Sequence, residues 1–436
     1  MREERGITLI ALIVTIVVLI ILAVISINIV FGEDGIIQRA ERGEEAHKSG
    51  ARNDQQAIDK LDDLIDDVIT DKTASPLDKL TTIQNSKVVA KDSEGVKIVV
   101  PKGFKVRTDL GTKASEGIVI EDASGNQFVW VPCTVTGKEG LTPYAQDKKY
   151  NNGQEGSYQY YYTHSSADTS IKYNDWTDVG NEASVKANGG FYVARFEAGI
   201  PSTASFYPDA ENTYITSGRN TSTVIPVSKA GSPSWNYISQ QNAVKVSAKM
   251  YEENDTVESK LIDSYAWDTI VNWMAGSGVN VKNSTSYGNY YNSSSSITVE
   301  NTLYALHTYN AAKEGSGKTD SWTRATSYGQ GSIALGAYST TGPDTENYTY
   351  TIRKEIATGA TDVTKVKNIY DMAGNMYEWT TETGRHNVEN GVEYAVLRGG
   401  SFYNYGSNNP VSYRHGYHST TNGSVNVGFR PVLYVK

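Results

Sequence analysis

The chain has little cysteine: Cys133 is the only one among 436 residues. A single cysteine excludes an intramolecular disulfide and any zinc or iron–sulfur site built from several cysteines. Basic residues are in the minority, because 40 Lys and Arg stand against 49 Asp and Glu and leave a net charge of -9. This acid excess argues against a protein that binds nucleic acid through its phosphates, since such binding requires a basic surface.

Phenylalanine is scarce beside tyrosine, with 8 Phe against 30 Tyr, whereas glycine is abundant at 39 residues. Tyr together with Ser, Gly and Asn is the composition of adaptable binding surfaces, because Tyr supplies rigid amphipathic contact area at a small entropy cost. The hydrophobic fraction is 39% and the charged fraction 20%, which fits a globular chain and not a disordered one. The composition therefore favours binding over catalysis.

Charge is absent from one long stretch, residues 7–30. As a helix with a rise of about 1.5 Å per residue, this stretch spans roughly 36 Å, which is enough to cross a bilayer. We therefore expect a transmembrane helix over 7–30, preceded by a short leader over 1–6. A buried core helix is the alternative interpretation.

The junction GITLIALIV resembles the start of type IV prepilins, in which a peptidase cuts after a glycine. The resemblance implies cleavage between Gly6 and Ile7, with a prepilin peptidase and pilin-like subunits as partners. The pilin pattern has a glutamate at the fifth mature position, where this chain has Ala11. Loss of that carboxylate removes a charge partner that helps to set subunit register. We expect a pilin-like anchor in the cytoplasmic membrane at a bacterial cell surface, with incorporation into a pilus-like structure as the alternative.

An acidic segment follows, with twelve acids and six bases over 33–72. Apolar residues recur at helical spacing in its second half: Ile58, Leu61, Ile65 and Val68. A narrow apolar stripe on an acidic background predicts a helical stem over 31–75. Pro76 is expected to end the stem, and 76–92 to form a linker.

The region 93–436 changes character. Short alternating runs divided by Gly, Asn and Ser predict strands, and the stretches 238–251 and 260–275 predict helices. The expected fold class is α+β: an N-terminal transmembrane helix followed by one large domain over 93–436 with long loops.

Several segments of this domain resemble the formylglycine-generating-enzyme-like (sulfatase-modifying-factor-like) superfamily, a variant of the C-type lectin fold. They are FVWVPC at 128–133, GGFYVARFEAG at 189–199, SKLIDSYAWDTIVNWM at 259–274, NIYDMAGNMYEWT at 368–380, VLRGGSFYN at 396–404 and VGFRPVL at 427–433. The resemblance places Trp379 in the core with a satisfied indole N–H. Arg398 and Arg430 stand beside apolar neighbours, so we expect them to pair with buried acids or carbonyls.

Some members of this superfamily hold calcium around the GNxxEW motif. The resemblance implies as ligands the side chains of Asp371 and Glu378 and the backbone carbonyls of Gly374 and Met376. Hard oxygen ligands with two carboxylates suit calcium. In the alternative interpretation, Asp371 caps the turn and Glu378 pairs with an arginine.

Catalysis is not expected. The oxidase of this superfamily holds copper with a pair of cysteines shortly after the GGS motif, and the stretch SFYNYGSNNPVSYRHGYH contains none. Cys133 falls in an expected strand, where cysteines are usually inert core residues. Of six histidines, only His415 and His418 are close neighbours, and no third metal ligand accompanies them. We expect no enzymatic activity and no cofactor beyond the calcium already considered.

The segment 401–426 holds four Tyr, five Asn, five Ser, two His and two Thr between two motifs of the superfamily, RGGSF and GFRPV. It resembles the variable region of proteins diversified by mutagenic retroelements, in which adenines are randomised. An AAC codon then yields Asn, Tyr, Ser, His, Thr or Asp. The expected ligand-binding residues are Tyr403, Asn404, Tyr405, Ser407, Asn408, Asn409, Ser412, Tyr413, His415, Tyr417, His418 and Asn422. A polar loop in an already Asn-, Ser- and Tyr-rich protein is the alternative.

These observations predict a surface-displayed, membrane-anchored binding protein, adhesin-like or receptor-like, whose ligand is an extracellular protein or glycan and not nucleic acid. A structural pilin or pseudopilin subunit with a large head domain is the first alternative. An exported enzyme of the formylglycine-generating superfamily is the second.

Overall fold

The computed structural model describes residues 74–134, 180–310, 321–341, 349–386 and 393–436, with the short pieces 16–19, 22, 50, 142–143, 150–151, 154–155 and 173–178. The chain divides into two units, Met1–Thr73 and Ala74–Lys436, and the second unit contains the folded domain. The expected leader, with Gly6 and Ile7, lies outside the described residues, as do most of the expected transmembrane helix and stem. Within the described residues, no helix combines the length and the hydropathy that crossing a membrane requires.

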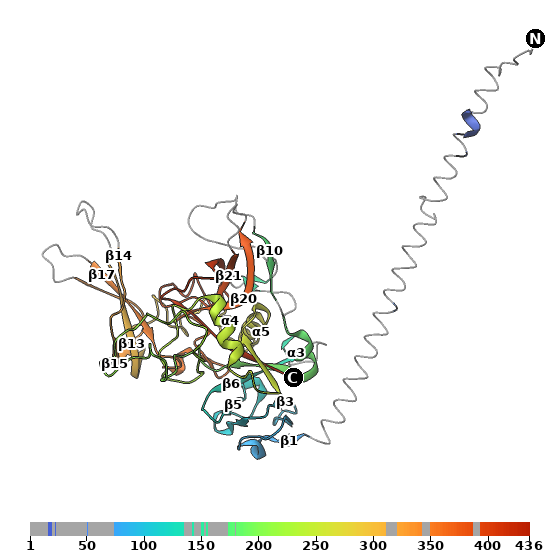
Figure 1. The fold of residues 1–436 in the computed structure, drawn as a ribbon, viewed down its shortest axis with the longest axis horizontal. Coiled ribbons are helices and arrows are strands. Elements are labelled where there is room, and N and C mark those ends of the chain that lie inside the picture. The colour runs from blue at the N-terminus through green and yellow to red at the C-terminus, as the bar shows by residue number, and fades with distance from the viewer. Residues whose placement is uncertain are drawn as a thin grey trace, which may run out of the picture. The chain divides into compact units, whose positions relative to one another are not determined.

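A seven-stranded sheet joins the beginning and the end of the second unit (Figure 1). Its order is β12-β24-β11-β6-β5-β4, with β7 paired to β6. The strands are β4 (Phe104–Val106), β5 (Val119–Asp122), β6 (Gln127–Thr134), β7 (Thr142–Pro143), β11 (Gly190–Ala194), β12 (Val257–Leu261) and β24 (Pro431–Val435). The C-terminal strand β24 lies between β11 and β12, so the last residues of the chain belong to the interior of the sheet.

Strand β6 shows why this sheet is central. Successive side chains of a strand point to opposite faces, and a sheet covered on both faces needs apolar residues at every position. Phe128 and Trp130 pack on one face with the N-terminal residues of the domain. Val129 and Val131 pack on the other face with helix α5 (Ser264–Ala275). The sheet is therefore sandwiched between two apolar layers.

The first apolar layer includes residues 76–92, so the prediction that these residues form a linker is wrong. Residues 76–92 contain the short helix η1 (Leu77–Leu80) and strand β2 (Val88–Lys91). Strand β2 lies between β1 (Ser75–Pro76), its parallel neighbour, and β3 (Lys97–Val100), its antiparallel neighbour. Leu77, Leu80 and Ala90 are buried against the central sheet. The apolar residues that the linker interpretation overlooked make the domain begin near Ala74, not Ser93.

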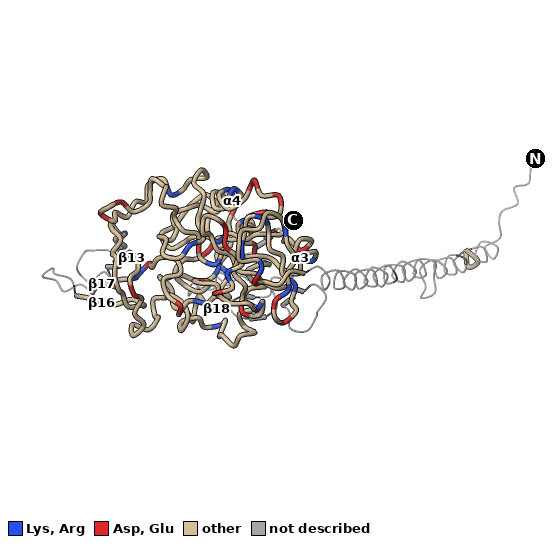
Figure 2. The backbone as a smooth tube through the Cα atoms, turned by 90° about the horizontal axis from the view of Figure 1, so that it is seen from below, with Lys and Arg blue, Asp and Glu red and all other residues tan. Residues whose placement is uncertain are grey.

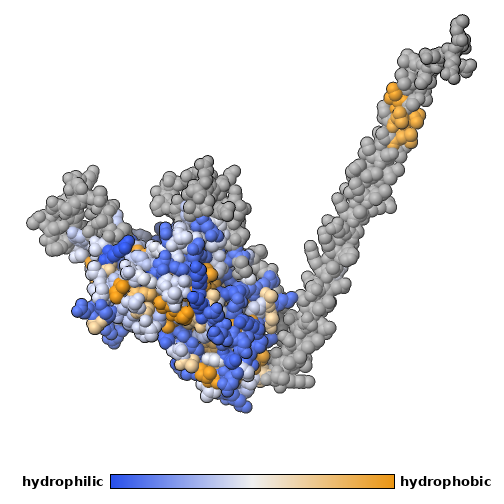
Figure 3. Space-filling view, in the orientation of Figure 1, coloured by the Kyte–Doolittle hydropathy of each residue, from blue (hydrophilic) through white to orange (hydrophobic). Residues whose placement is uncertain are grey.

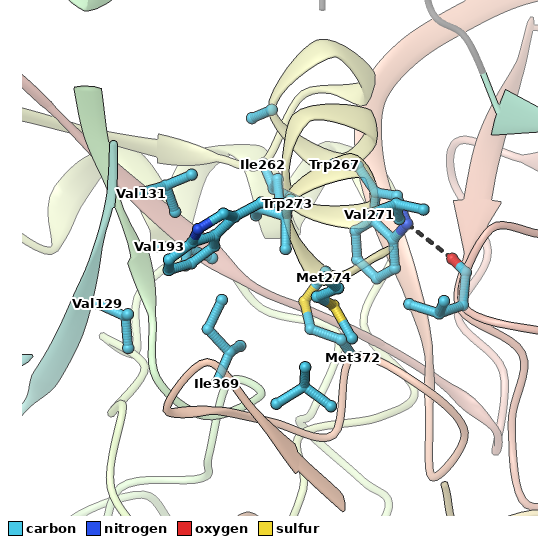
Figure 4. Close-up of a cluster of buried hydrophobic side chains, with 14 of the residues drawn as sticks. Val129, Val131, Val193, Ile262, Trp267, Val271, Trp273, Met274, Ile369 and Met372 are labelled. Atoms are coloured by element: carbon cyan, nitrogen blue, oxygen red, sulfur yellow. Dashed lines mark hydrogen bonds between the residues drawn. The ribbon is translucent and has the colours of Figure 1, made fainter. Parts of the chain in front are cut away.

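The second layer is built on α5 (Figure 4). The helix begins at Asp263, whose carboxylate accepts a hydrogen bond from the Ala266 N–H at 2.7 Å, as expected of an N-cap. Trp267 packs in this layer and donates its indole N–H to the Val411 carbonyl at 2.9 Å. The predicted helix over 260–275 thus starts later, because the preceding residues form β12 and pair with β24.

The second unit also contains the α-helices α4 and α3. Helix α4 (Gln240–Lys249) confirms the helix predicted over 238–251, and Ser239 caps its N-terminus. Helix α3 (Glu182–Asn188) was not predicted. The short helices are η2 (Thr108–Leu110), η3 (Ala114–Glu116) and η4 (Asp362–Thr364). With these few helices among many strands, the fold is richer in sheet than the α+β expectation implied.

The second half of the domain adds two five-stranded sheets. One consists of β10 (Tyr173–Thr177), β20 (Tyr377–His386), β21 (Glu393–Arg398), β22 (Arg414–Ser419) and β23 (Val427–Phe429). The other, here called the projecting sheet, extends to one side of the body in Figure 1. It consists of β13 (Thr298–Asn310), β14 (Ser321–Thr323), β15 (Tyr328–Ala334), β16 (Tyr338–Thr341) and β17 (Thr349–Ile356). Two small hairpin pairs are β8 (Tyr150–Asn151) with β9 (Gln154–Glu155) and β18 (Lys365–Val366) with β19 (Ile369–Tyr370).

Buried arginines connect these layers. Arg398 pairs with Asp268 of α5, and Arg430 pairs with Glu378 of β20. Arg414 pairs with Glu382, with Nε to Oε2 at 3.0 Å. The predictions for Arg398 and Arg430 are therefore confirmed, and so is the satisfied indole of Trp379, which donates to the Ile238 carbonyl at 2.9 Å.

Candidate ligand-binding surface

The loop over 401–410 follows β21 and forms hydrogen bonds with a second loop at residues 291–292. Two glycines allow its entry: Gly399 and Gly400 have φ of 86° and 71°, and a Cβ on Gly400 would lie 2.1 Å from the Asn409 carbonyl oxygen. The Tyr291 N–H donates to the Asn404 carbonyl at 2.8 Å, and the Gly406 N–H donates to the Asn292 side chain at 3.0 Å. The backbone of the 401–410 loop is thus held by the close packing at Gly400 and by the hydrogen bonds to residues 291 and 292.

Side chains from this loop meet the projecting sheet in what we call the tyrosine–arginine cluster: Tyr291, Tyr309, Arg353, Tyr403 and Tyr405. The Arg353 Cζ lies 5.0 Å from the ring centroid of Tyr291 and 5.1 Å from that of Tyr403. It lies 6.0 Å from the ring centroid of Tyr309. The ring centroids of Tyr291 and Tyr405 are 4.8 Å apart. The guanidinium is therefore surrounded by aromatic rings, within the range of cation–π attraction.

Strand register explains how this cluster forms. His307 of β13 is directly opposite Arg353 of β17 in the antiparallel ladder. Residues two apart on a strand share a face, so Tyr309 lies on the same face as His307. That face meets the 401–410 loop, because the His307 ring lies 5.1 Å from the Phe402 ring.

Beneath the cluster lies a buried polar network centred on Glu355. Its Oε2 accepts a hydrogen bond from the Tyr214 hydroxyl at 2.6 Å and from the Asn236 amide at 3.2 Å. The same oxygen lies 3.0 Å from His307 Nε2. Arg219 bonds to Asn236 and, at 3.2 Å, to the Tyr328 hydroxyl. The network joins the 214–237 segment to β13, β15 and β17, and so holds the projecting sheet in place.

A second arginine, Arg324, lies beside Tyr237. The exposed Arg324 has its Cζ 5.6 Å from the ring centroid of Tyr237. Tyr237 adopts a φ of 58°, which is unusual for a residue with a bulky side chain. Its backbone N–H donates to the Ser424 carbonyl at 3.0 Å. The Tyr237 hydroxyl is buried and has no hydrogen-bond partner among the described residues.

At neutral pH the tyrosines of the cluster are neutral and Arg353 is charged. Burial raises the pKa of Tyr403, although the charges of Arg353 and Arg324 oppose this. Burial likewise raises the pKa of Tyr405, with a smaller contribution from Tyr291. Burial lowers the pKa of Arg353 from its very high ordinary value. At neutral pH the cluster therefore offers phenol hydroxyls around a partly desolvated cation.

The structure brings part of the predicted ligand-binding set to this surface. Tyr405 is 47% exposed. Exposed or half-buried positions in the same segment are Tyr403, Asn404, Ser407, Asn408, Asn409 and Asn422. The Asn404 side chain also bonds within the loop, accepting from the Ser401 hydroxyl at 2.6 Å.

Two predicted contact residues are corrected by burial. Ser412 is fully buried and donates to the Val281 carbonyl at 2.7 Å. Tyr413 is 6% exposed and packs in the core with Tyr377, Trp379 and Leu397. The chain enters strand β22 directly after Tyr413, and packing at this point buries both side chains.

The two neighbouring histidines, His415 and His418, lie on strand β22. Their ring centroids are 5.3 Å apart, and both residues are half-buried. Burial lowers the pKa of His418, whose ring lies 6.1 Å from that of Trp379. The predicted contact Tyr417 lies between them, and its side chain is outside what the structure describes.

The predicted calcium ligands lie beside Arg430. Both carboxylate oxygens of Glu378 accept from Arg430 Nε, at 3.1 and 2.9 Å. Asp371 has a φ of 56°, and its Oδ2 accepts from the Gly359 N–H at 2.7 Å. Burial raises the pKa of both acids, and Arg430 opposes the rise. These contacts are those of the alternative interpretation, in which Asp371 stabilises a turn and Glu378 pairs with an arginine.

The other two predicted ligands, Gly374 and Met376, belong to the same buried turn. The Met376 N–H donates to Glu197 Oε1 at 3.0 Å, and Gly374 has a φ of 77°. Among the described residues, no group of three or more His, Cys, Asp or Glu is placed to hold a metal ion. Calcium, whose predicted site includes two backbone carbonyls, stays a prediction.

Sequence reasoning missed Tyr291, Tyr309 and Arg353, because nothing along the chain links them to 401–426. General surface features would not have located the cluster either. Lys, Arg, Asp and Glu are interspersed over the body in Figure 2. The face shown in Figure 3 is mostly hydrophilic, with apolar residues in small separate groups.

The C-terminal part of the chain matches a known family. Residues 269–435 match the family model of the Sulfatase-modifying factor enzyme 1-like domain. This range includes the motifs at 368–380, 396–404 and 427–433, so the predicted resemblance is confirmed for this part. No curated protein matches the chain.

Three solved structures show distant similarity. The "Crystal Structure of CarF" is 13% identical with a TM-score of 0.29, covering 57% of this chain and 87% of that one. "Treponema denticola variable protein 1" is 13% identical with a TM-score of 0.27, covering 61% and 94%. The "Major Tropism Determinant M1 Variant" is 13% identical with a TM-score of 0.28, covering 81% and 73%. TM-scores this low do not establish a shared fold.

Proposed function

We propose that this chain is a surface-displayed, membrane-anchored binding protein, adhesin-like or receptor-like, that contacts its ligand through the 401–410 loop and the adjoining projecting sheet. The observation that supports this most directly is the exposed Tyr405 on a loop whose backbone is fixed. Tyr is enriched at binding hot spots because it buries a large area with few rotatable bonds. A fixed loop reduces the ordering cost that a ligand must overcome.

The anchoring part of the proposal rests on the uncharged 7–30 stretch and the prepilin-like junction before it. The proposal does not include an enzymatic activity. Cys133 is buried in β6, and burial raises the pKa of its thiol, so the reactive thiolate is disfavoured.

Diversification of 401–426 is part of the same proposal. Exposed side chains such as Tyr405, Ser407 and Asn408 can change without disturbing the core, since framework groups hold the loop. A near-copy of the codons for 398–430 that differs at adenines, beside a reverse transcriptase gene, would support it. An encoding locus that lacks such a copy would argue for a fixed ligand surface.

The binding function can be tested with an unbiased probe. A random peptide library displayed on phage is selected on the purified full chain, and single peptides are then titrated against variants. Tyr405→Ala should weaken the selected peptides by roughly thirtyfold or more, the usual effect of a tyrosine hot spot. The matched control is Ile83→Ala, because Ile83 is a large side chain that is also exposed, at 38%, but lies outside both the loop and the projecting sheet. Equal losses in the two variants, or none in either, would contradict the proposal.

A further inference from the structure

The charge of the tyrosine–arginine cluster indicates the chemistry of its ligand. The chain as a whole is acidic, with a net charge of -9. Two arginines, Arg353 in the cluster and Arg324 beside Tyr237, instead add positive charge here. The Arg353 Cζ lies 5.1 Å from the ring centroid of Tyr403, and the Arg324 Cζ lies 5.6 Å from that of Tyr237. The surface that the proposed function assigns to the ligand is thus locally cationic.

The arrangement of Arg353 favours a planar anion. The faces of a guanidinium stack on aromatic rings, whereas its N–H groups point outward in the plane of the group. Arg353 has the rings of Tyr291 and Tyr403 within about 5 Å, at 5.0 and 5.1 Å. The in-plane fork of an arginine stacked in this way matches the two oxygens of a carboxylate. Because Arg353 is partly desolvated, an anion beside it is attracted more strongly than it would be in water.

The phenol groups supply the remaining contacts. Tyr403 and Tyr405 are neutral at physiological pH, because the ordinary pKa of tyrosine is about 10 and burial raises it further in both. A neutral phenol can donate a hydrogen bond to an anion. Tyrosine and arginine among Ser and Asn are also the residues that protein-binding surfaces prefer.

We propose that the tyrosine–arginine cluster, together with Arg324, binds the carboxylate side chains of an acidic segment of a partner protein. This inference rests on the proposed function, because it specifies the ligand of the same surface. Its tests are separate, since a surface that binds neutral peptides through Tyr405 would retain the function and lose the inference.

The experiment measures binding of the full chain to three fluorescent probes by polarisation: a short poly-L-glutamate peptide, a poly-L-glutamine peptide of the same length, and hyaluronate, a carboxylate-bearing polysaccharide. Poly-L-glutamate should bind most tightly, and its affinity should fall as salt is raised. Arg353→Gln and Arg324→Gln should each weaken it by roughly tenfold or more. The affinity of Arg353→Lys for poly-L-glutamate should lie between those of the unmodified chain and Arg353→Gln, because lysine keeps the charge and loses the planar fork.

The matched control is Lys79→Gln, which removes one positive charge from an exposed position in η1. It should bind poly-L-glutamate as the unmodified chain does. Circular dichroism shows whether each variant is folded. If Arg353→Gln does not fold, the inference is tested by Arg324→Gln, because Arg324 is exposed. Equal affinity for poly-L-glutamate and poly-L-glutamine, or equal effects of Arg324→Gln and Lys79→Gln, would overturn the inference. Tighter binding of hyaluronate would overturn the assignment to a protein partner.

Discussion

Two tyrosines of the 401–426 segment should respond to truncation in opposite ways. Tyr413 is 6% exposed and lies in the core, where its ring stacks 6.0 Å from that of His415 at an interplanar angle of 17°. Tyr405 is 47% exposed and contacts chiefly Tyr291. Replacing a large buried aromatic residue by alanine costs about 3–5 kcal/mol, because transfer free energy is lost and a cavity remains. Replacement at an exposed site typically changes stability by about 0.5 kcal/mol or less.

These free-energy changes correspond to changes in the midpoint of thermal unfolding. For a domain of this size, each kcal/mol corresponds to roughly 2 °C. Tyr413→Ala should therefore lower the midpoint by roughly 6 °C or more, whereas Tyr405→Ala should leave it within about 1 °C. The assay is thermal unfolding of the full chain followed by near-ultraviolet circular dichroism, which reports aromatic packing.

Tyr413→Phe is the control for Tyr413→Ala. It retains the ring and should recover most of the lost midpoint, because packing of the ring and not only the hydroxyl accounts for the effect. Equal midpoints for Tyr405→Ala and Tyr413→Ala would refute the division of the segment into an exposed loop and a buried strand entry. The same result would remove the structural basis of the proposed ligand surface.

Other parts of the chain give three further predictions. Coexpressed with a prepilin peptidase, the chain should begin at Ile7 by N-terminal sequencing, and an intact Met1 would indicate an ordinary anchor. Glu378→Gln should lower the free energy of unfolding by about 3 kcal/mol or more, because it leaves the buried Arg430 charge without its carboxylate. Denaturant melts should show a far smaller loss for the control Asp255→Asn, which breaks an exposed pair with Lys102. Because burial holds the pKa of His418 below 6.5, the unfolded chain takes up a proton before the fold does, so stability should decrease as the pH falls through this value. His418→Gln should lack that part of the decrease in pH-dependent melts, and identical profiles would contradict it.

Local sequence patterns determined much of the framework. The short alternating runs at 96–100 and 127–132 predicted strands that the structure contains as β3 and β6. The arginines within apolar motifs predicted buried ion pairs, because a buried guanidinium requires an acid or a carbonyl. The motif order DMAGNxxEW, RGGS and GFR lies within the range that matches the family model.

Only the tertiary structure decided which of the 401–426 side chains face outward and what they meet. Tyr405 and Tyr413 are the same residue type in the same polar segment, and the difference between them arises because β22 pairs with β21 directly after Tyr413. Arg353 is far from this segment along the chain, and the antiparallel pairing of β13 with β17 places it there. Periodicity is a property of neighbouring residues, whereas burial and the composition of a binding surface depend on contacts between distant ones.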